Sequence, residues 1–488
     1  MLFTTIEFIL FFLLVLTTIV TIKHKKFQHL FLLFASYFFF YYTSNYLIVL
    51  LIFSTLLDFY AGQEIWKTKN ISHKKIIFSI SLIGNLGLLG FFKYADFGIS
   101  QINTVGNSLG IDPIPFLNLA LPIGISFYTF QTISYTADIY RGKLEPSKSL
   151  REFALFVSFF PQLVAGPIVR AKDFLPQLRE KMENFSSKNL ALISIHDRNL
   201  KLGITIMAFG FLKKMFFADN IAPIANDIFA NSLNATSLEI WLGTIAFSFQ
   251  IYGDFSGYSD IAIGAALILG FKFPLNFNKP YFAKSPSDFW KRWHISLSSW
   301  LRDYLYIPLG GNKKSSIRTY SNLFAVMILG GLWHGAAINF IVWGTLHGLY
   351  LVLHKSLKII FPKQSQNFFF KTKLGKIISI SITQYFILLA WIPFRLQEID
   401  GMFYSMSKFI IVDFQILEVI EFILGHKFNV LILVLFIIIH FISFRNRNIV
   451  EKISKFNLKT WFIVIIIITT SIIFFYNGNP EDFIYFRF

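Results

Sequence analysis

The sequence predicts an all-α, polytopic membrane protein, and three observations support this fold class. Hydrophobic residues make up 55% of the chain and charged residues only 15%, whereas soluble domains carry about 25% charged residues. Several apolar runs are long enough to cross a bilayer. Basic residues lie in short clusters between these runs, a pattern typical of cytoplasmic loops. We expect about 10–12 transmembrane helices, with re-entrant or interfacial helices around a central funnel or tunnel.

The charge and the composition exclude several function classes. The net charge is +18, and the basic residues lie in the loop clusters. This pattern indicates contact with anionic lipid and argues against binding of nucleic acid. The chain has no Cys, which excludes disulfides, thiolate metal ligands and an acyl-cysteine intermediate. His347 and His354 are seven residues apart without a nearby carboxylate, so we expect no metal site. No phosphate-binding loop of the Walker type is present, which argues against ATP-driven transport.

The basic clusters also predict the order of the N-terminal spans and their orientation in the membrane. No basic residue precedes the first apolar run, and Lys23, Lys25 and Lys26 follow it. This asymmetry predicts a retained first span with the N-terminus outside. A weakly charged outer loop is expected at 93–113. Five spans are expected in this part, at residues 2–22, 29–42, 46–60, 76–92 and from Pro115 to just before Arg141.

The middle of the chain is less regular. Residues 152–169 are apolar but carry Pro161, Gly166 and Pro167 between basic flanks, which favours a re-entrant or interfacial segment. Residues 237–271 have the length for one long element or two broken ones. We interpret the chain as one integral-membrane domain, 1–488. Its parts are N-terminal spans (1–140), a core with the catalytic segments (141–376) and C-terminal spans (377–488).

One histidine lies between glycines in the middle of an apolar stretch. His334 belongs to Leu332-Trp333-His334-Gly335, inside the apolar residues 323–357. An ionisable side chain in a membrane is costly, so its presence indicates function. A buried structural histidine bonded to carbonyls or to a Trp is the alternative. His334 follows Arg318 by 16 residues, roughly 24 Å of helix, which places it beyond the bilayer midplane at a hairpin apex or glycine break.

A second histidine lies in an aromatic and basic segment, residues 289–300. Trp290 and His294 are spaced i, i+4 and are expected to share one helix face. An interfacial amphipathic helix would explain this composition. The functional interpretation is a cytoplasmic mouth that holds an anionic, phosphate-bearing donor while His294 reaches inward.

A third candidate is the polar stretch Gly253-Asp254-Phe255-Ser256-Gly257-Tyr258-Ser259-Asp260, which interrupts an apolar run. Asp254 and Tyr258, as well as Ser256 and Asp260, are spaced i, i+4. A hydrogen-bonded network that fixes helix packing would explain them. Acids that line a substrate path are the rival interpretation.

These segments resemble the membrane-bound O-acyltransferase (MBOAT) family, and within it the branch that O-acetylates alginate. The resemblance covers most of the chain. It rests on residues 121–131, 160–168, 254–260, 292–304, 310–312, 332–335 and 483–486.

The resemblance implies that His334 is the catalytic residue and that His294 has a second role. It implies an enzyme that moves an acetyl group from a cytoplasmic donor, acetyl-CoA, toward an extracytoplasmic polysaccharide such as alginate. No bound cofactor is implied. The implied partners are an extracytoplasmic O-acetyltransferase and the polysaccharide, and the implied location is the inner membrane of a bacterium. Further candidates along the donor path are Trp333, Asp254, Tyr258, Asp260, Arg292 and Trp293.

The chemistry of the residues is compatible with this implication. A neutral imidazole can take a proton from an acceptor hydroxyl that attacks a thioester. We expect His334 to be this base, while His294 and nearby donors orient the thioester or stabilise its oxyanion. Two alternatives stay open. One is D-alanyl transfer to teichoic acid by a related branch. The other is a secondary transporter or flippase that uses intramembrane Asp and His residues as a proton relay.

Overall fold

The structure is a computed structural model of the whole chain. It describes every residue except 164–165, 184–196, 314, 362–371, 447, 477–482 and 485–488. The described residues form helices and loops, without a strand among them, which confirms the all-α fold class. The chain divides into two compact units: Met1–Met207 with Tyr258–Pro274, and Ala208–Gly257 with Leu275–Phe488. Two of the three boundaries fall inside the helices α9 (Asp197–Phe211) and α11 (Ser237–Ile268), and the third, between Pro274 and Leu275, falls in a loop.

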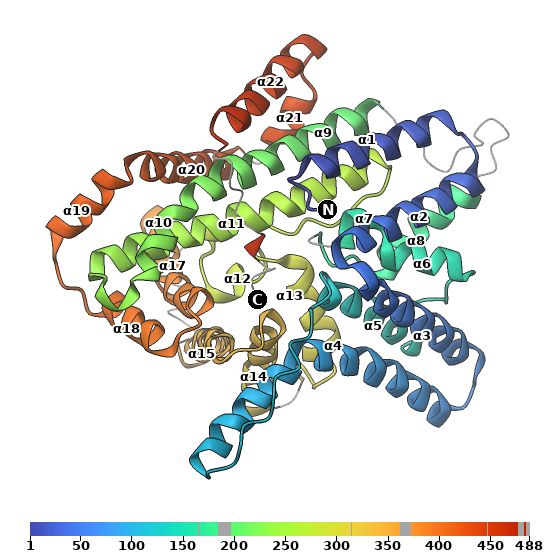
Figure 1. Cartoon of the computed structure of the whole chain (residues 1–488), viewed down its shortest axis with the longest axis horizontal. Coiled ribbons are helices and arrows are strands. Elements are labelled where there is room, and N and C mark those ends of the chain that lie inside the picture. Colours follow the sequence, from blue (N-terminus) through green and yellow to red (C-terminus); the bar gives the residue numbers. More distant parts are fainter. Residues whose placement is uncertain are drawn as a thin grey trace. The chain divides into compact units, whose positions relative to one another are not determined.

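The first unit contains the N-terminal helices, drawn from blue to teal in Figure 1. Helix α3 packs against α4, α5 and α6, and α2 packs against α6. The helices of this unit are α1 (Ile6–Thr21), α2 (Lys25–Ser44), η1 (Asn45–Leu47), α3 (Ile48–Lys67), α4 (Ile71–Ser108), α5 (Ile125–Tyr140), α6 (Leu150–Ser158), α7 (Phe160–Leu163) and α8 (Ala171–Glu183).

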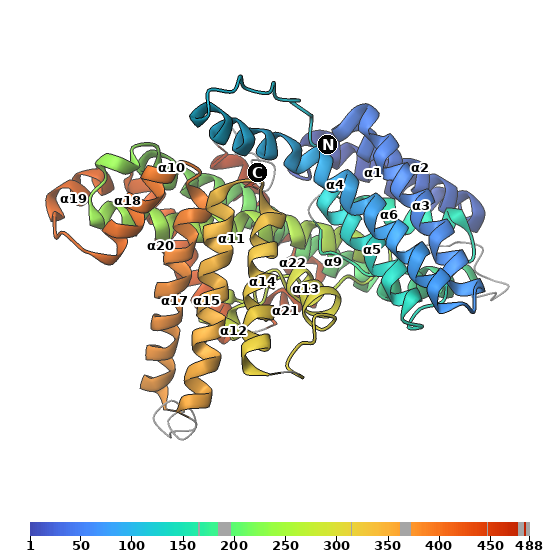
Figure 2. The same ribbon diagram turned by 90° about the horizontal axis from the view of Figure 1, so that it is seen from below.

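Helix α4 is longer than the sequence analysis predicted. It continues to Ser108, so the outer loop expected at 93–113 is wrong for most of its length. Polar side chains in these last turns bind the segment that follows the helix. Asn103 accepts from the backbone N–H of Ile114 at 2.7 Å, and the Asp96 carboxylate accepts from that of Leu117 at 2.7 Å. The polarity that suggested a loop therefore serves to fasten a returning chain (Figure 2).

A buried polar network joins α3, α4 and α5. The carboxylate of Asp58 accepts from the Ser81 hydroxyl at 2.5 Å and from the Asn85 amide at 2.8 Å. Ser81 and Asn85 in turn contact Thr136 and Thr132 of α5. Hydrogen bonds of this kind hold helices together where water is absent, so these polar residues contribute to packing.

The segment 152–169 is broken, as its prolines and glycine predict. Helix α6 ends at Ser158, and the short α7 runs from Phe160 to Leu163. The nine residues of α6 are too few to cross a bilayer, which needs about 20. Residues 164–165 of this motif lie outside the described residues. The interruption agrees with a re-entrant or interfacial segment, and its position in the membrane stays a prediction.

The second unit contains the remaining helices. Residues 237–268 form one continuous helix, so the first of the two alternatives for this stretch is correct. The helices that begin in this unit are the π-helical η2 (Leu212–Ala218), α10 (Asp219–Ala230), η3 (Ser232–Asn234), α11, η4 (Pro280–Phe282), α12 (Pro286–Phe289), α13 (Ile295–Leu301), the π-helical η5 (Arg302–Tyr306), α14 (Ser316–His334), α15 (Ile338–Ile360), α17 (Lys373–Arg395), α18 (Ile399–Ile410), α19 (Ile416–Gly425), α20 (Lys427–Arg445), α21 (Ile449–Ser454) and α22 (Leu458–Phe474).

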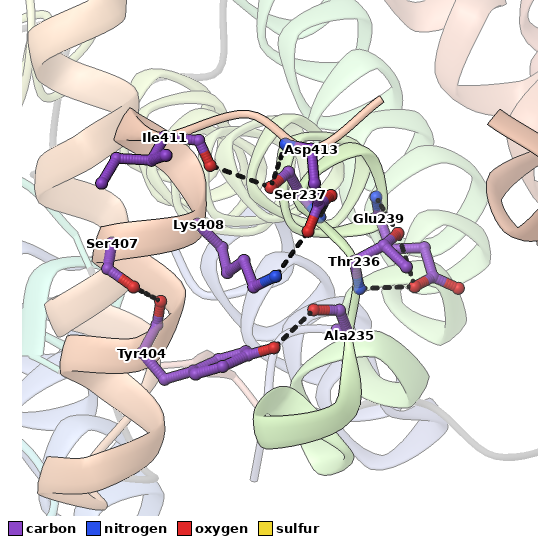
Figure 3. Close-up of polar contacts among 9 residues, drawn as sticks. All are labelled: Ala235, Thr236, Ser237, Glu239, Tyr404, Ser407, Lys408, Ile411 and Asp413. Atoms are coloured by element: carbon purple, nitrogen blue, oxygen red, sulfur yellow. Dashed lines mark hydrogen bonds and ion pairs between the residues drawn. The ribbon is translucent and has the colours of Figure 1, made fainter. Parts of the chain in front are cut away.

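The start of α11 is fixed by side chains from two directions (Figure 3). Thr236 and Glu239 form a reciprocal capping box, in which the Glu239 carboxylate accepts from the Thr236 N–H at 2.8 Å and the Glu239 N–H reaches the Thr236 hydroxyl at 3.4 Å. Asp413, which follows α18, accepts from the Ser237 N–H at 2.9 Å and pairs with Lys408. These bonds satisfy N–H groups that a helix start leaves without partners.

Three long helices, α14, α15 and α17, lie side by side in the second unit (Figure 2). Glycines allow the first two to touch along their backbones. A Cβ on Gly331 would lie 2.2 Å from the carbonyl oxygen of Phe340, and one on Gly344 would lie 2.4 Å from that of Met327. Any side chain at these two positions would force α14 and α15 apart.

Four described segments are long and apolar enough to cross a membrane. They are Lys25–Lys67, Ile71–Ser108, Lys373–Arg395 and Lys427–Arg445. Two shorter apolar helices, Ile6–Thr21 and Leu458–Phe474, add to them. The protein is therefore a polytopic helical membrane protein. The total of 10–12 spans and the central funnel stay predictions.

Candidate active site

His334 is the last residue of α14. The helix runs without a break from Ser316 to His334, and Gly335 follows in an extended conformation. Three residues later α15 begins at Ile338. The histidine thus lies at the apex of a helical hairpin, as the glycine pattern predicts, whereas its depth in the bilayer stays a prediction.

Aromatic rings enclose the His334 imidazole, whose residue is only 4% exposed. The ring centroid lies 5.0 Å from that of Trp343 on α15 and 5.2 Å from that of Phe394 on α17, both edge-to-face. Trp333 contacts it from the preceding position at 5.1 Å. An aromatic shell lowers the local dielectric constant, so charge that develops at the ring interacts strongly with its surroundings.

The space beside the glycines Gly331 and Gly335 is occupied by Phe340 of the neighbouring helix α15. Gly331 faces the Phe340 backbone, and a Cβ on Gly335 would lie 2.0 Å from the Phe340 ring. Sequence analysis allowed either a backbone or a substrate in this space. At these two positions it is the chain itself that comes close.

His294 is fully buried and stands at the N-cap of α13 with φ +41° and ψ +56°, in the left-handed region. Its Nδ1 lies 3.3 Å from Oδ1 of Asn276. The same oxygen accepts from the Ser296 hydroxyl at 2.9 Å and from the Ser296 backbone N–H at 3.3 Å. Backbone bonds between the segments 276–278 and 292–295 hold both residues in place.

These contacts assign the tautomer of His294. A backbone N–H can only donate, so the atom that Ser296 N–H contacts is the amide oxygen of Asn276. That oxygen can only accept. The Ser296 hydroxyl lies 3.4 Å from Nδ1 of His294 but donates to the Asn276 oxygen at 2.9 Å, so we assign the proton of the neutral ring to Nδ1. In the neutral ring Nε2 then keeps its lone pair and is an acceptor. His294 lies outside the candidate membrane spans, and burial lowers its pKa to about 3, so the ring is neutral at physiological pH.

Trp333 connects the two histidines. Its ring centroid lies 5.9 Å from that of His294 and 5.1 Å from that of His334. The indole is itself buried. The structure thus brings together three candidates, His294, Trp333 and His334, which are separated by up to 40 residues in sequence.

One expectation for the segment 289–300 is wrong. Trp290 and His294 do not share a helix face, because α12 ends at Phe289 and α13 begins only at Ile295. The left-handed backbone of His294 turns the chain between these short helices. The imidazole consequently points toward Asn276, whereas the Trp290 ring lies 5.1 Å from that of His347.

Trp293 and Arg292 differ in what they can offer to a ligand. Trp293 is buried against rings that include Phe277 at 5.0 Å and Trp391 at 4.9 Å, so it helps to build the wall beside His294. Arg292 is partly exposed and pairs with Asp288 at 2.9 Å. Its charge is already balanced, which weakens the expectation that it holds a phosphate group.

Asp254 belongs to a buried ion cluster. Lys214 of η2 lies 2.7 Å from Asp254 and 2.8 Å from Asp219 of α10. The other carboxylate oxygen of Asp254 accepts from the backbone N–H of Ile484 at 2.7 Å. These contacts support the packing interpretation that sequence analysis kept open for Asp254.

Tyr258 and Asp260 belong to the first unit. Tyr258 is fully buried, its hydroxyl lies 3.3 Å from that of Thr4, and its ring stacks on Phe3 with 5.8 Å between centroids. Asp260 is half-buried. The contacts of Tyr258 with Thr4 and Phe3 are those of a packing residue.

Sequence reasoning missed the residues that orient His294 and enclose His334. They are Asn276, Ser296, Phe255, Trp343 and Phe394. A weak signal existed for Asn276, a polar residue between apolar ones in Leu275-Asn276-Phe277. The aromatic residues carry no such signal in a chain with 61 Phe.

The fold and the site define a class: a helical membrane protein with two buried imidazoles in contact with one indole. A comparison with known families identifies this class: the profile of the membrane-bound O-acyltransferase (MBOAT) family matches residues 146–392. This range is half of the chain and contains both histidines. The chain belongs to the MBOAT family. A secondary transporter is therefore disfavoured.

Individual relatives are more specific. A Pseudomonas syringae protein named "Probable alginate O-acetylase AlgI" is 42% identical over 344 residues, which cover 70% of this chain and 61% of the relative. An Azotobacter vinelandii protein of the same name is 46% identical over 58% of this chain and 54% of the relative. The chain thus matches little more than half the length of these proteins. The peptidoglycan O-acetyltransferase of Helicobacter pylori is 37% identical, over 71% of this chain and 67% of the relative.

Proposed function

We propose that this protein is an O-acyltransferase that moves an acetyl group across the membrane for the O-acetylation of an extracytoplasmic polysaccharide. One observation carries the proposal: His294 and His334, both buried, contact the same indole inside the segment that matches the family profile. The names of the relatives support the acetyl group and a glycan acceptor, because they include alginate O-acetylases and a peptidoglycan O-acetyltransferase.

His334 acts as the general base in this proposal. Its imidazole removes the proton of the acceptor hydroxyl while the oxygen attacks the carbonyl carbon of the thioester. The new C–O bond forms, the C–S bond breaks, and the proton passes from the imidazole to the leaving thiolate, so no proton is gained or lost overall. A positioned base of this kind contributes roughly 10²–10⁴-fold to the rate.

His294 orients a substrate in this proposal. Sequence analysis allowed it to stabilise an oxyanion, but its neutral Nε2 has no proton to donate when Nδ1 binds Asn276. A lone pair on Nε2 suits an O–H or N–H group of the acceptor or of the donor. The fixed tautomer leaves this role independent of pH within the physiological range.

The donor and the partners extend the proposal. We infer acetyl-CoA as the donor on the cytoplasmic side of a bacterial inner membrane, with the N-terminus outside. The acceptor side would involve an extracytoplasmic O-acetyltransferase that completes the transfer. The order of basic clusters in the sequence supports this orientation.

D-alanyl transfer is the second candidate. The teichoic acid D-alanyltransferase of Bacillus subtilis is 32% identical over 248 residues, which cover 49% of this chain and 60% of the relative. The alginate O-acetylases are more similar, at 42% and 46%. We therefore favour the acetyl group.

The test uses membranes that contain the full chain and supplies either radiolabelled acetyl-CoA or a D-alanyl carrier protein. We expect label from acetyl-CoA in a glycan fraction, and loss of this transfer by roughly 10²-fold or more in His334→Ala. His294→Ala should also lose activity, while both variants insert in normal amounts. Wild-type rates in His334→Ala would refute the assignment, and label from the carrier alone would select the D-alanyl reaction.

A further inference from the structure

A groove lies between α3 and α4 in the first unit. Its volume is about 440 Å³. Apolar and aromatic side chains line most of it, with Glu64 and His73 at one end. The lining residues are Phe53, Leu56, Leu57, Tyr60, Ala61, Glu64, His73, Ile77 and Ile80.

The groove follows the two helices lengthwise. On α3 it extends over twelve residues, from Phe53 to Glu64, or about 16 Å of helix. The two helices approach each other closely at Leu57, because a Cβ on Gly84 of α4 would lie 2.5 Å from the Leu57 side chain. One leaflet of the hydrocarbon layer is about 15 Å thick, half of the whole. The groove therefore has about the length of a single leaflet.

The lining faces outward from the helices. Phe53, Leu56, Tyr60 and Ile80 are 38–59% exposed, although both helices are apolar enough to cross a membrane. Large apolar side chains with this exposure in a membrane protein face lipid. The acyl chain of a lipid can fill such a groove and cover its apolar surface.

The open end carries positive charge. Between Ala61 and Ile80 the chain has four lysines, Lys67, Lys69, Lys74 and Lys75, and one acid, Glu64, a net charge of +3 with His73 neutral. Glu64 is paired with Lys67 at 3.2 Å. Lys69 lies in the turn between the two helices, and Lys74 and Lys75 lie in the first turns of α4.

We propose that this groove binds one anionic phospholipid, with an acyl chain between α3 and α4 and the phosphate at Lys69, Lys74 and Lys75. The charge selects this occupant. A zwitterionic lipid would fit the apolar groove equally well but would gain little from the lysines, each of which contributes about 1 kcal/mol toward an anionic surface. The apolar helix of another protein would leave the cationic end without a counterpart.

The test measures lipid retention by the purified full chain with native mass spectrometry. Phosphatidylglycerol and phosphatidylcholine with identical acyl chains are offered at equal concentration. We expect one phosphatidylglycerol to be retained in preference to phosphatidylcholine. In Lys69→Gln/Lys74→Gln/Lys75→Gln this preference should fall by about fivefold for each lysine removed. The matched control removes three lysines of another turn, Lys23, Lys25 and Lys26, and should keep the preference.

A second pair of variants tests the groove itself. Ala61→Phe places a ring among the lining residues and should abolish the retained phosphatidylglycerol while leaving the lysines intact. Val49→Phe on the same helix lies outside the lining, is 64% exposed at Val49, and should behave as wild type. Equal retention of both lipids by the wild type would overturn the proposal. So would unchanged retention of phosphatidylglycerol in Ala61→Phe.

Discussion

The backbone N–H of Ile484 donates to Oδ2 of Asp254 at 2.7 Å, and this bond ties the far end of the chain to the middle of α11. Phe483, the preceding residue, packs its ring 5.7 Å from that of Phe255, which lies 4.6 Å from the His294 ring. Tyr485 and Phe486 of the same motif lie outside the described residues. The buried carboxylate of Asp254 thus supports the site through packing.

Removal of the Asp254 carboxylate should destabilise the protein strongly. Asp254→Ala leaves Lys214 with Asp219 alone and deprives the Ile484 N–H of its acceptor. Loss of one partner from a buried ion pair costs about 3–5 kcal/mol. We expect a clearly lower thermal transition in detergent, with a smaller decrease in Asp254→Asn, which keeps an oxygen acceptor.

The control for this prediction is a surface pair. Asp227 is 57% exposed and lies 2.8 Å from His426, and exposed pairs contribute at most about 1 kcal/mol. Asp227→Ala should therefore leave the transition nearly unchanged. Equal decreases in Asp254→Ala and Asp227→Ala would contradict a special role for the buried cluster.

A methyl group at Gly344 should disturb the hairpin that carries His334. Its Cβ would lie 2.4 Å from the carbonyl oxygen of Met327, and overpacking of this kind costs about 1–3 kcal/mol. We expect Gly344→Ala to lower both the thermal transition and the acyltransfer rate, since the α14–α15 spacing sets the position of the imidazole.

The matched variant for this test is Gly87→Ala on α4, where a Cβ meets nothing within 4 Å. It should be neutral or stabilising by up to about 1 kcal/mol, because Ala favours helix over Gly. If Gly87→Ala lowered the thermal transition as much as Gly344→Ala does, close backbone contact at Gly344 would not be the cause of the destabilisation.

The pH profile should respond to Asn276. Burial holds the pKa of His294 at about 3, so we expect no loss of acyltransfer from its protonation between about pH 5 and pH 9. Asn276→Asp keeps an oxygen acceptor but adds a negative charge, which favours the imidazolium and raises the pKa. Activity should then fall on the acid side, at pH values where the wild type is unaffected.

Asn278→Asp provides the comparison, since Asn278 is exposed and two residues away. Its profile of rate against pH should match that of the wild type. If the profiles of Asn276→Asp and Asn278→Asp coincide, the contact between Asn276 and His294 does not control the protonation of the ring.

Asp413 should stabilise the start of α11 in a pH-dependent way. The pKa of Asp413 is lowered by its bond to Lys408 and by the Ser237 N–H. A lowered carboxyl pKa means stability that is present above the unfolded value, 3.8, and is lost as pH falls through the lower folded value. Asp413→Ala should unfold at a lower temperature than wild type at about pH 7, and this difference should shrink toward about pH 3.

Asp400→Ala, at an exposed position on α18, is the control and should be close to wild type at both pH values. A difference between Asp413→Ala and wild type that stays constant with pH would attribute its effect to packing and not to the charge.

Composition and periodicity determined much of this protein. The apolar runs and basic clusters specify a helical membrane protein, because a segment that crosses lipid must satisfy its own backbone hydrogen bonds. The glycines beside His334 predict a break, since residues without a Cβ allow the close turn from α14 to α15. The motif around both histidines is local in sequence, so the family could be inferred from it.

The tertiary structure decided what depends on contacts between distant segments. The orientation of His294 comes from Asn276, eighteen residues earlier, and from a left-handed backbone that no helical pattern predicts. The continuation of α4 depends on the returning chain that Asp96 and Asn103 bind. The sequence makes Asp254 a candidate for the donor path, and only the structure shows its contacts with Lys214 and with the Ile484 N–H. The spacing of residues in the sequence predicts which side chains share one face of one helix. A site is built from side chains of several helices, and only the packing of the helices decides which side chains meet.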